Sequence, residues 1–290
     1  MVIIMNGLLV IDKPKEFTSR DVVNIVGKAL NTRKVGHTGT LDPLATGVLI
    51  VAINEGLKVV NLLGNDTKEY VATVKCGVMT DTFDTTGIVL NEDNDFVLNK
   101  EEILVILKSF LGKSIQEVPI YSAVKVNGKK LYQYARNNES VILPKKEIEI
   151  FDIELIDVFD DSFTFKVLVS KGTYIRSLIR DIGVKLNIYC CMSDLRRTKV
   201  GIFDIDQSVT IDDIRNGKYV VTDIEVALSN YKKVVVDKML ESMIRSGRIL
   251  DNEYGEDIVY FVNSDNKVLA IYQIYCKDNS KIKPLKVFNI

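Results

Sequence analysis

Residues 36–53 read GHTGTLDPLATGVLIVAI and join a polar loop to a run of six apolar residues. The loop, residues 36–47, holds three glycines, three threonines, the single histidine of the chain and the pair Asp42-Pro43. Glycine permits positive φ or a close chain approach, threonine supplies a hydroxyl, and the proline biases Asp42 away from helical geometry. We interpret 48–53 as a buried strand and the loop as a candidate site for chemistry, with a turn-forming Asp42 as the alternative.

The composition predicts a globular chain with room for two domains, because 47% of its 290 residues are hydrophobic. No apolar run approaches the roughly 20 residues of a membrane span, and the N-terminus has no basic leader or signal cleavage site. Four cysteines without a CxxC spacing and a single histidine argue against a structural zinc site. Reduced thiols and a cytoplasmic location are therefore expected.

The net charge of −1 hides a strong grouping of the basic residues. Segregated charge predicts a local basic surface on a neutral protein, with ordinary solvated surface as the alternative for any one group. The three groups are Lys125, Lys129, Lys130 and Arg136; Arg176, Arg180 and Lys185; and Arg196, Arg197 and Lys199.

Hydrophobic periodicity predicts an α+β first domain with a largely antiparallel sheet and flanking helices, followed by a small, mostly β module. We place these domains at residues 1–230 and 231–290. Strands are expected at 7–12, 48–53, 68–78, 121–126, 146–158, 163–169, 195–203, 257–263 and 267–275. Helices are expected at 18–30, 56–63, 99–111 (ended by Gly112), from Thr173 onward, and at 236–246.

The stretch KGTYIR, residues 171–176, is the second candidate site. Arg176 falls in the first turn of the predicted helix, where a cation opposes the helix macrodipole. A compensating carboxylate or phosphate is therefore expected, with a solvated arginine as the alternative.

Residues 125–136 combine four cations with Tyr132 and Tyr134 around an Asn127-Gly128 hairpin turn. This composition suits RNA, because cations bind phosphates and aromatic rings stack on exposed bases. A surface hairpin with chance tyrosines is the alternative. The glycine loop itself is neither a Walker A sequence nor a GxGxxG fingerprint.

Six blocks together resemble one family: GLLVIDKP, VGHTGTLDPLATGVL, KEY, VPIYSAVKVNGKKLYQYAR, SKGTYIRSLIRDIG and LRR. In order and spacing they are similar to the bacterial TruB family of tRNA pseudouridine synthases over about residues 7–203. One departure is Val118, where the family usually has the first of two prolines.

The resemblance implies a pseudouridine-synthase catalytic domain with an RNA-gripping insertion at about 118–145, and a PUA-like RNA-binding module at its C-terminal end. The activity that it implies is isomerisation of uridine 55, in the T-arm stem-loop of tRNA, to pseudouridine. The reaction is expected to need no metal or other cofactor, and the target base must first be flipped out of the RNA loop. The enzyme is expected to be a monomer that does not associate with a membrane.

The resemblance also assigns roles residue by residue. Asp42 matches the catalytic nucleophile, which attacks C1′ or C6 or assists formation of a glycal, and Arg176 matches the arginine that pairs with it. Tyr174 matches a tyrosine that helps to remove the C5 proton. The substrate-binding positions are Tyr70, which stacks on the base, Leu195, which packs on it, Tyr174, and His37, which enters the RNA loop. Lys125, Lys129, Lys130 and Arg136 would grip the T-arm.

The residues by themselves leave two other functions open. A non-catalytic protein that binds or folds tRNA would share the basic groups and the β module. A nucleotide-dependent transferase would use the glycine loop for phosphate, although that loop lacks the expected lysine.

Overall fold

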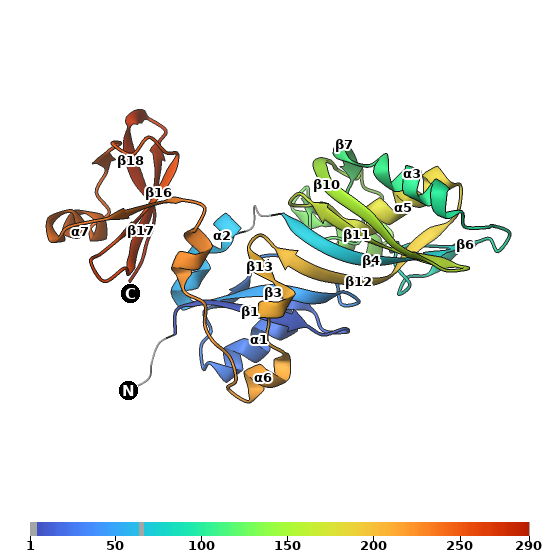
Figure 1. Cartoon of the computed structure of the whole chain (residues 1–290), viewed down its shortest axis with the longest axis horizontal. Helices are drawn as coiled ribbons and strands as arrows, with labels where there is room; N and C mark the ends of the chain where they lie inside the picture. The colour runs from blue at the N-terminus through green and yellow to red at the C-terminus, as the bar shows by residue number, and fades with distance from the viewer. Residues whose placement is uncertain (1–4, 64–66, 290) are drawn as a thin grey trace.

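The computed structural model describes residues 5–63 and 67–289, which form a large mixed sheet and a smaller second sheet (Figure 1). The main sheet of the described chain runs in the order β1-β3-β12-β4-β11-β10-β7, with β2 paired to β3 and β13 to β12. The strand pairs are antiparallel except β3 with β12. The strands are β1 (Gly7–Lys13), β2 (Val35–His37), β3 (Thr46–Ile53), β4 (Lys68–Cys76), β7 (Gly112–Glu117), β10 (Lys145–Val158), β11 (Ser162–Val169), β12 (Cys190–Val200) and β13 (Phe203–Asp204).

One face of the main sheet carries the principal core. Residues on β11, and on β4 from Glu69 onward, alternate between half-buried and buried, which is the pattern of an antiparallel sheet covered on one face. Four helices pack on the covered face, α1 and α6 against β1 and β3, and α3 and α5 farther along the sheet (Figure 1). They are α1 (Ser19–Ala29), α3 (Lys100–Lys108), α5 (Ile175–Leu186) and α6 (Ile211–Arg215). This arrangement confirms the predicted α+β class.

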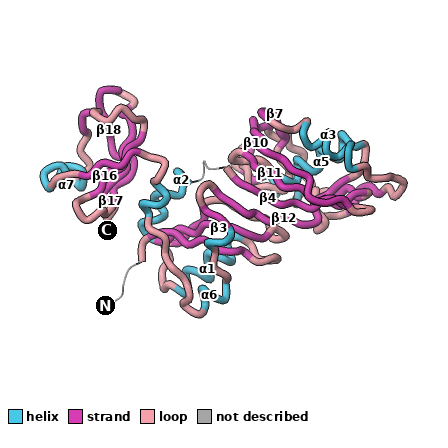
Figure 2. Tube along the Cα trace, in the orientation of Figure 1, coloured by secondary structure: helices cyan, strands magenta, loops and turns pink. Residues whose placement is uncertain are grey.

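Side-chain caps explain where three of these helices begin. Thr18 caps α1 in a capping box with Asp21, Asn99 caps α3 through the backbone N–H of Glu102, and Thr210 caps α6. Shorter elements complete the fold, and among them α2 lies between the main sheet and the second sheet (Figure 2). They are η1 (Asn54–Val59), α2 (Val60–Leu63), β5 (Val78–Thr80), β6 (Val89–Glu92), β8 (Lys125–Val126), β9 (Lys129–Lys130), α4 (Leu131–Arg136), η2 (Ile205–Gln207) and η3 (Ile224–Leu228).

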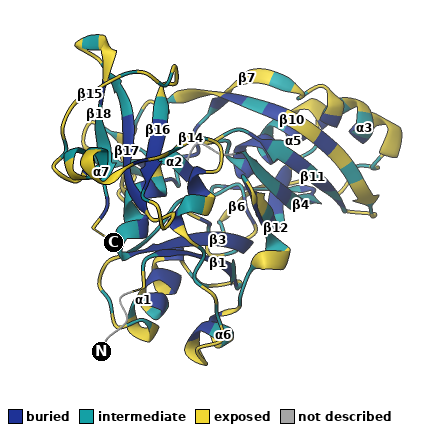
Figure 3. Ribbon diagram, turned by 60° about the vertical axis from the view of Figure 1, so that its left-hand side comes forward, coloured by how far each residue is buried: buried dark blue, intermediate teal, exposed yellow. Residues whose placement is uncertain are grey.

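The second sheet packs on the opposite face of β1 and β3. Leu8, Val10 and Ile50 from the main sheet share one buried cluster with Ile271 and Phe288 from the second, and β1 and β3 are buried throughout their middle (Figure 3). The strand order of the second sheet is β14-β16-β17-β18-β15. The elements are β14 (Lys232–Val235), α7 (Lys238–Arg245), β15 (Leu250–Asp251), β16 (Ile258–Val262), β17 (Val268–Tyr275) and β18 (Asp278–Val287).

Several predicted boundaries were wrong. Residues 121–124 form no strand, and only 125–126 pair with 129–130 in the short hairpin. Helix α3 ends at Lys108, and Gly112, with φ of +88°, begins β7 instead of ending the helix. Helix α5 has Tyr174 and not Thr173 at its N-cap position, and no side chain there caps the helix. Strand β12 begins at Cys190, five residues before its predicted start. Within the described residues, no helix is both long and apolar enough to cross a bilayer.

Gly47 allows the parallel contact between β3 and β12. Its φ is +99°, and a Cβ at this position would lie 2.2 Å from the carbonyl oxygen of Arg197, its register partner. The positive φ and the lack of room beside Arg197 therefore exclude any residue larger than glycine. The glycine loop consequently uses this glycine for strand packing.

Replacing Gly47 by alanine is expected to lower the free energy of unfolding by about 3 kcal/mol or more, because steric overlap adds to the strained φ. Gly112→Ala is the matched control, since Gly112 also has a positive φ but no atom within 4 Å of the added Cβ. That control is expected to cost about 1 kcal/mol. Urea denaturation of both variants tests this, and equal losses would show that the close strand contact contributes nothing.

Candidate active site

Five of the residues to which the resemblance assigns a catalytic or substrate-binding role meet in one cleft of about 450 Å³. Asp42 comes from the glycine loop, Tyr70 from β4, Leu195 from β12, and Tyr174 and Arg176 from the start of α5. Tyr121 and Tyr132, from the 118–145 insertion, line the same cleft. Residues more than 130 positions apart in the chain therefore share one polar site.

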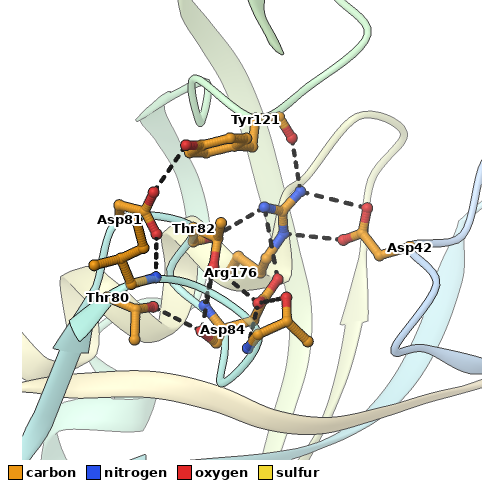
Figure 4. A network of polar contacts seen from close by, with 9 residues as sticks. Asp42, Thr80, Asp81, Thr82, Asp84, Tyr121 and Arg176 are labelled. Carbon is orange, nitrogen blue, oxygen red and sulfur yellow. Dashed lines mark hydrogen bonds and ion pairs between the residues drawn. The ribbon is translucent and has the colours of Figure 1, made fainter. Parts of the chain in front are cut away.

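An ion pair between Asp42 and Arg176 forms the centre of this cleft (Figure 4). Arg176 Nε lies 2.9 Å from Asp42 Oδ2, and Nη2 donates to Oδ1 at 3.4 Å, so the guanidinium holds both carboxylate oxygens. The Arg176 side chain is only 6% exposed, whereas that of Asp42 is 37% exposed. The arginine is therefore buried behind a carboxylate that faces the cleft, and this carboxylate is the anion expected near the start of α5.

Two backbone carbonyl oxygens and a second carboxylate also surround the guanidinium of Arg176. Nη1 donates to the carbonyl oxygen of Thr82 at 2.9 Å, and Nη2 donates to that of Tyr121 at 3.0 Å. Asp84, itself buried, places Oδ2 3.9 Å from Nη1 and accepts hydrogen bonds from Thr82 Oγ1, Thr86 N and Thr86 Oγ1 at Oδ1. Acceptors on several sides fix the plane of the guanidinium, which a buried charge requires.

The segment that follows β1 anchors the backbone on both sides of Asp42. Ser19 Oγ accepts from Leu41 N at 2.9 Å and lies 3.2 Å from Leu41 O, to which it donates. Pro43 O accepts from Glu16 N at 2.8 Å and from Lys13 Nζ at 3.3 Å. Asp42 is thus held by its two neighbours as well as by its ion pair.

Lys13 is a site residue that sequence reasoning missed. It is 0% exposed, and its Nζ donates to the carbonyl oxygens of Phe17 at 2.6 Å and Pro14 at 2.9 Å. Burial lowers the pKa of Lys13 to about 8, although the nearby carboxylate of Asp42 opposes the shift. The one available signal was the position of a lysine directly after an apolar strand and before Pro14.

Arg197 was predicted as part of a basic surface, and this was wrong. The residue is 1% exposed, and it donates from Nε to Val48 O at 2.7 Å and from Nη2 to Gly39 O at 3.2 Å. Its buried guanidinium ties the glycine loop to β3. Arg176, from another predicted basic group, is also buried, because it pairs with Asp42 and donates to two backbone carbonyl oxygens.

The other predicted residues differ in how far they enter the cleft. Tyr174 N donates to Gln116 Oε1 at 2.8 Å, Gln116 Nε2 donates back to Tyr174 O at 3.1 Å, and burial raises the pKa of the Tyr174 phenol. Tyr70 is 7% exposed and Leu195 5%, so both form the inner wall. His37 lies outside the lining, next to Thr38, and its Nδ1 is buried without a hydrogen-bond partner.

The basic hairpin and α4 organise cations on tyrosine rings. Lys129 Nζ lies 4.7 Å from the ring centroid of Tyr134, and Lys130 Nζ lies 5.5 Å from that of Tyr132. Arg136 lies 5.4 Å from the Tyr132 ring as well. In this structure the two rings therefore hold cations of the basic hairpin and α4.

No group of three or more histidine, cysteine, aspartate or glutamate side chains is placed to hold a metal ion within the described residues. The cysteines are free, with Cys76, Cys190 and Cys191 buried and Cys276 exposed. The lining of the cleft combines the acid Asp42 with the cations Arg176, Arg197, Lys68 and Lys171 and with tyrosine rings.

Comparison with known proteins gives consistent results. A model of the TruB family pseudouridylate synthase N-terminal domain matches residues 27–175, and a model of the tRNA pseudouridylate synthase B C-terminal domain matches residues 176–245. The chain is 40% identical over 291 residues to "tRNA pseudouridine synthase B" of Clostridium tetani, covering 98% of this chain and 100% of the relative. It is 42% identical over 300 residues to the protein of that name from Oceanobacillus iheyensis, covering 99% and 98%.

Among solved structures, the fold is similar to a chain of an H/ACA ribonucleoprotein bound to a substrate RNA containing 2′-deoxyuridine. The TM-score is 0.73 at 25% identity, and the match covers 99% of this chain and 86% of that one. A chain of a Cbf5-Nop10-Gar1 complex matches with the same TM-score and identity, covering 85% of its length.

His37 is expected to titrate below its ordinary pKa of 6.5, because burial, Arg20 and Arg197 all disfavour its charged form. The stability that the neutral imidazole contributes is present above pH 6.5 and is lost as the pH falls through the lowered folded-state value. Since His37 is the single histidine, proton NMR of the imidazole signals gives its midpoint directly. A midpoint at or above that of the urea-unfolded chain would contradict this expectation.

Proposed function

Because the chain belongs to the TruB family of pseudouridylate synthases, we propose that it isomerises uridine 55 in the T-arm of tRNA. Family membership establishes the general activity: the protein is a tRNA pseudouridine synthase, an isomerase. The proposal adds the target nucleotide, the roles of the cleft residues and the mode of RNA binding.

The observation that carries the proposal is the ion-paired carboxylate in a cleft with aromatic walls. A cleft of about 450 Å³ falls in the range of sites for small ligands, so one flipped nucleotide is a suitable occupant. An unpaired acid would be repelled by RNA phosphates, whereas the Arg176 guanidinium balances the charge of Asp42 and leaves its carboxylate facing the cleft. A protein that merely binds RNA does not need this arrangement.

In the reaction, the bond between C1′ and N1 breaks, a bond between C1′ and C5 forms, C5 loses its proton and N1 gains one. We assign Asp42 as the nucleophile, attacking C1′ or C6 or assisting formation of a glycal. Arg176 holds both oxygens of the carboxylate and fixes their direction. Because two backbone carbonyl oxygens already fix the guanidinium, Arg176 needs little reorganisation at the moment of reaction.

The walls of the cleft suit a uracil ring. We propose that Tyr70 stacks on the flipped base and that Leu195 packs on it, since both lie on the inner wall. We also assign Tyr174, in the lining of the cleft, a role in removing the C5 proton. Burial raises the pKa of its phenol above the ordinary value, which disfavours a phenolate base.

Binding of the T-arm is assigned to surfaces around the cleft. Lys125, Lys129, Lys130 and Arg136 of the insertion would contact phosphates, and His37 would enter the RNA loop vacated by flipped bases. Flipping costs a few kcal/mol, which stacking and phosphate contacts must offset. We take residues 1–230 as the catalytic domain and 231–290 as a PUA-like RNA-binding module, in a monomeric, cofactor-free, cytoplasmic enzyme.

Asp42→Asn is expected to lower isomerisation at least about 10³-fold while the affinity for tRNA stays near that of the wild type. The amide keeps the shape of the side chain but is not a nucleophile. Release of tritium from C5-labelled uridine in an unmodified tRNA transcript measures the reaction, and filter binding measures affinity.

Asp194→Asn is the matched control, because Asp194 forms an exposed ion pair with Lys15 away from the cleft lining. A transcript with cytidine at position 55 is the substrate control and should release no tritium. Near-normal release by the Asp42 variant would refute its assignment, and release from the control transcript would refute the assigned nucleotide.

Arg176→Lys is expected to lower turnover at least about 100-fold, since lysine cannot hold both carboxylate oxygens and two backbone carbonyls at once. Arg215→Lys, in an exposed ion pair with Asp212, tests whether an arginine-to-lysine change is harmful in general. Wild-type turnover by the Arg176 variant would eliminate the ion pair from the mechanism.

A further inference from the structure

Tyr121 joins two parts of the active site through two different atoms (Figure 4). Its hydroxyl donates to Asp81 Oδ2 at 2.8 Å, and its backbone carbonyl accepts from Arg176 Nη2 at 3.0 Å. Asp81 belongs to the 80–87 loop, whereas Tyr121 belongs to the insertion that carries the basic hairpin. One residue therefore links the insertion, the 80–87 loop and the guanidinium that holds Asp42.

The 80–87 loop is a fixed support for this link. Phe83 has φ of +60°, a costly conformation for a non-glycine residue that persists only where its surroundings enforce it. Met192 on β12 provides this restraint, because its N–H donates to Phe83 O and its carbonyl accepts from Thr85 N. Asp81 is held in turn, since its Oδ1 accepts from Ile88 N at 2.7 Å.

Tyr121 is also joined to the rest of the insertion. The chain turns directly after it, with Ser122 N donating to Ile120 O and Tyr132 N donating to Ser122 O. The ring of Tyr132 lies next to both Lys130 and Arg136. A displacement of the basic hairpin would therefore reach the Tyr121 carbonyl over a short path.

We propose that Tyr121 and Asp81 are positioning residues, whose hydrogen bond holds the insertion against the 80–87 loop and thereby sets the direction of Arg176. The inference rests on the proposed role of the Asp42–Arg176 pair. Neither residue needs to touch the uridine. They affect the reaction through the carbonyl oxygen of Tyr121, which accepts a hydrogen bond from the Arg176 guanidinium.

The geometry around Arg176 indicates that loss of the Tyr121–Asp81 hydrogen bond changes the rate of the reaction more than the stability of the fold. Arg176 shares Nη2 between Tyr121 O and Asp42 Oδ1, and the second of these contacts is long, at 3.4 Å. A small shift of the carbonyl therefore changes how the guanidinium meets the carboxylate. The hydrogen bond to Asp81 raises the pKa of Tyr121, so the hydroxyl remains a donor throughout the neutral range.

The test compares Tyr121→Phe, Asp81→Ala and Asp81→Asn by steady-state and single-turnover tritium release from a tRNA transcript. Tyr121→Phe and Asp81→Ala should each lower kcat about tenfold with KM within about twofold of the wild type. Asp81→Asn should stay within about threefold, because its amide can still bond both Ile88 N–H and the tyrosine hydroxyl. The double variant Tyr121→Phe/Asp81→Ala should be no slower than the slower single variant.

Tyr260→Phe is the matched control, since this tyrosine also bonds a carboxylate, Glu225, at 3.3 Å but lies in the buried cluster between the sheets. It should keep wild-type kcat, and its melting temperature measures the general cost of losing such a bond. Wild-type kcat for Tyr121→Phe would overturn the proposal, as would a rise in KM alone, which would assign Tyr121 to RNA binding.

Failure of this inference can be told apart from failure of the proposed function. If the wild-type enzyme releases no tritium from the T-arm uridine, the assigned target is wrong whatever the variants do. If the wild type is active and the Asp42 variant inactive, a fully active Tyr121→Phe rejects the hydrogen-bond link alone.

Discussion

The structure around the cleft depends on one requirement, which is that the guanidinium of Arg176 stays buried and charged beside Asp42. A buried arginine needs acceptors for its donors, and here they come from three separate segments: the glycine loop, the 80–87 loop and the first turn of the insertion. Arg176 is therefore a group that all three segments contact. The same contacts that satisfy the arginine therefore assemble the site.

The sheet provides the rigid frame for that assembly. Strands β3 and β12 pair in parallel at Thr46 and Gly47, where Gly47 approaches Arg197, and this contact brings the glycine loop next to the strand that carries Leu195. Arg197 then bonds Val48 and Gly39, and the segment after β1 holds the two neighbours of Asp42. The direction of the catalytic carboxylate is thus set from its backbone and from its oxygens together, which is the preorganisation that a nucleophile in a polar cleft requires.

Elements with a strict periodicity could be predicted from the sequence. The alternation in 163–169 and the cap at Thr18 identify β11 and α1 because local geometry alone determines them. Residues 121–124 were wrongly expected to be a strand, since their conformation follows from Arg176 and from the turn after Tyr121, both of which are long-range. The burial of Lys13 and Arg197 was missed for the same reason: backbone carbonyls brought near by the fold satisfy them, and such acceptors leave no sequence signal.

The central claim is that a T-arm uridine leaves its loop and lies in the cleft against a carboxylate held by Arg176. A crystal structure of the enzyme with a T-arm stem-loop that carries 5-fluorouridine at the target position tests this most directly. We predict that the base will lie against Tyr70 and Leu195, with its sugar facing Asp42 and the ion pair to Arg176 intact. A base that stays stacked in the RNA loop, or that occupies the separate cleft beside Asp12 and Arg196, would contradict this account.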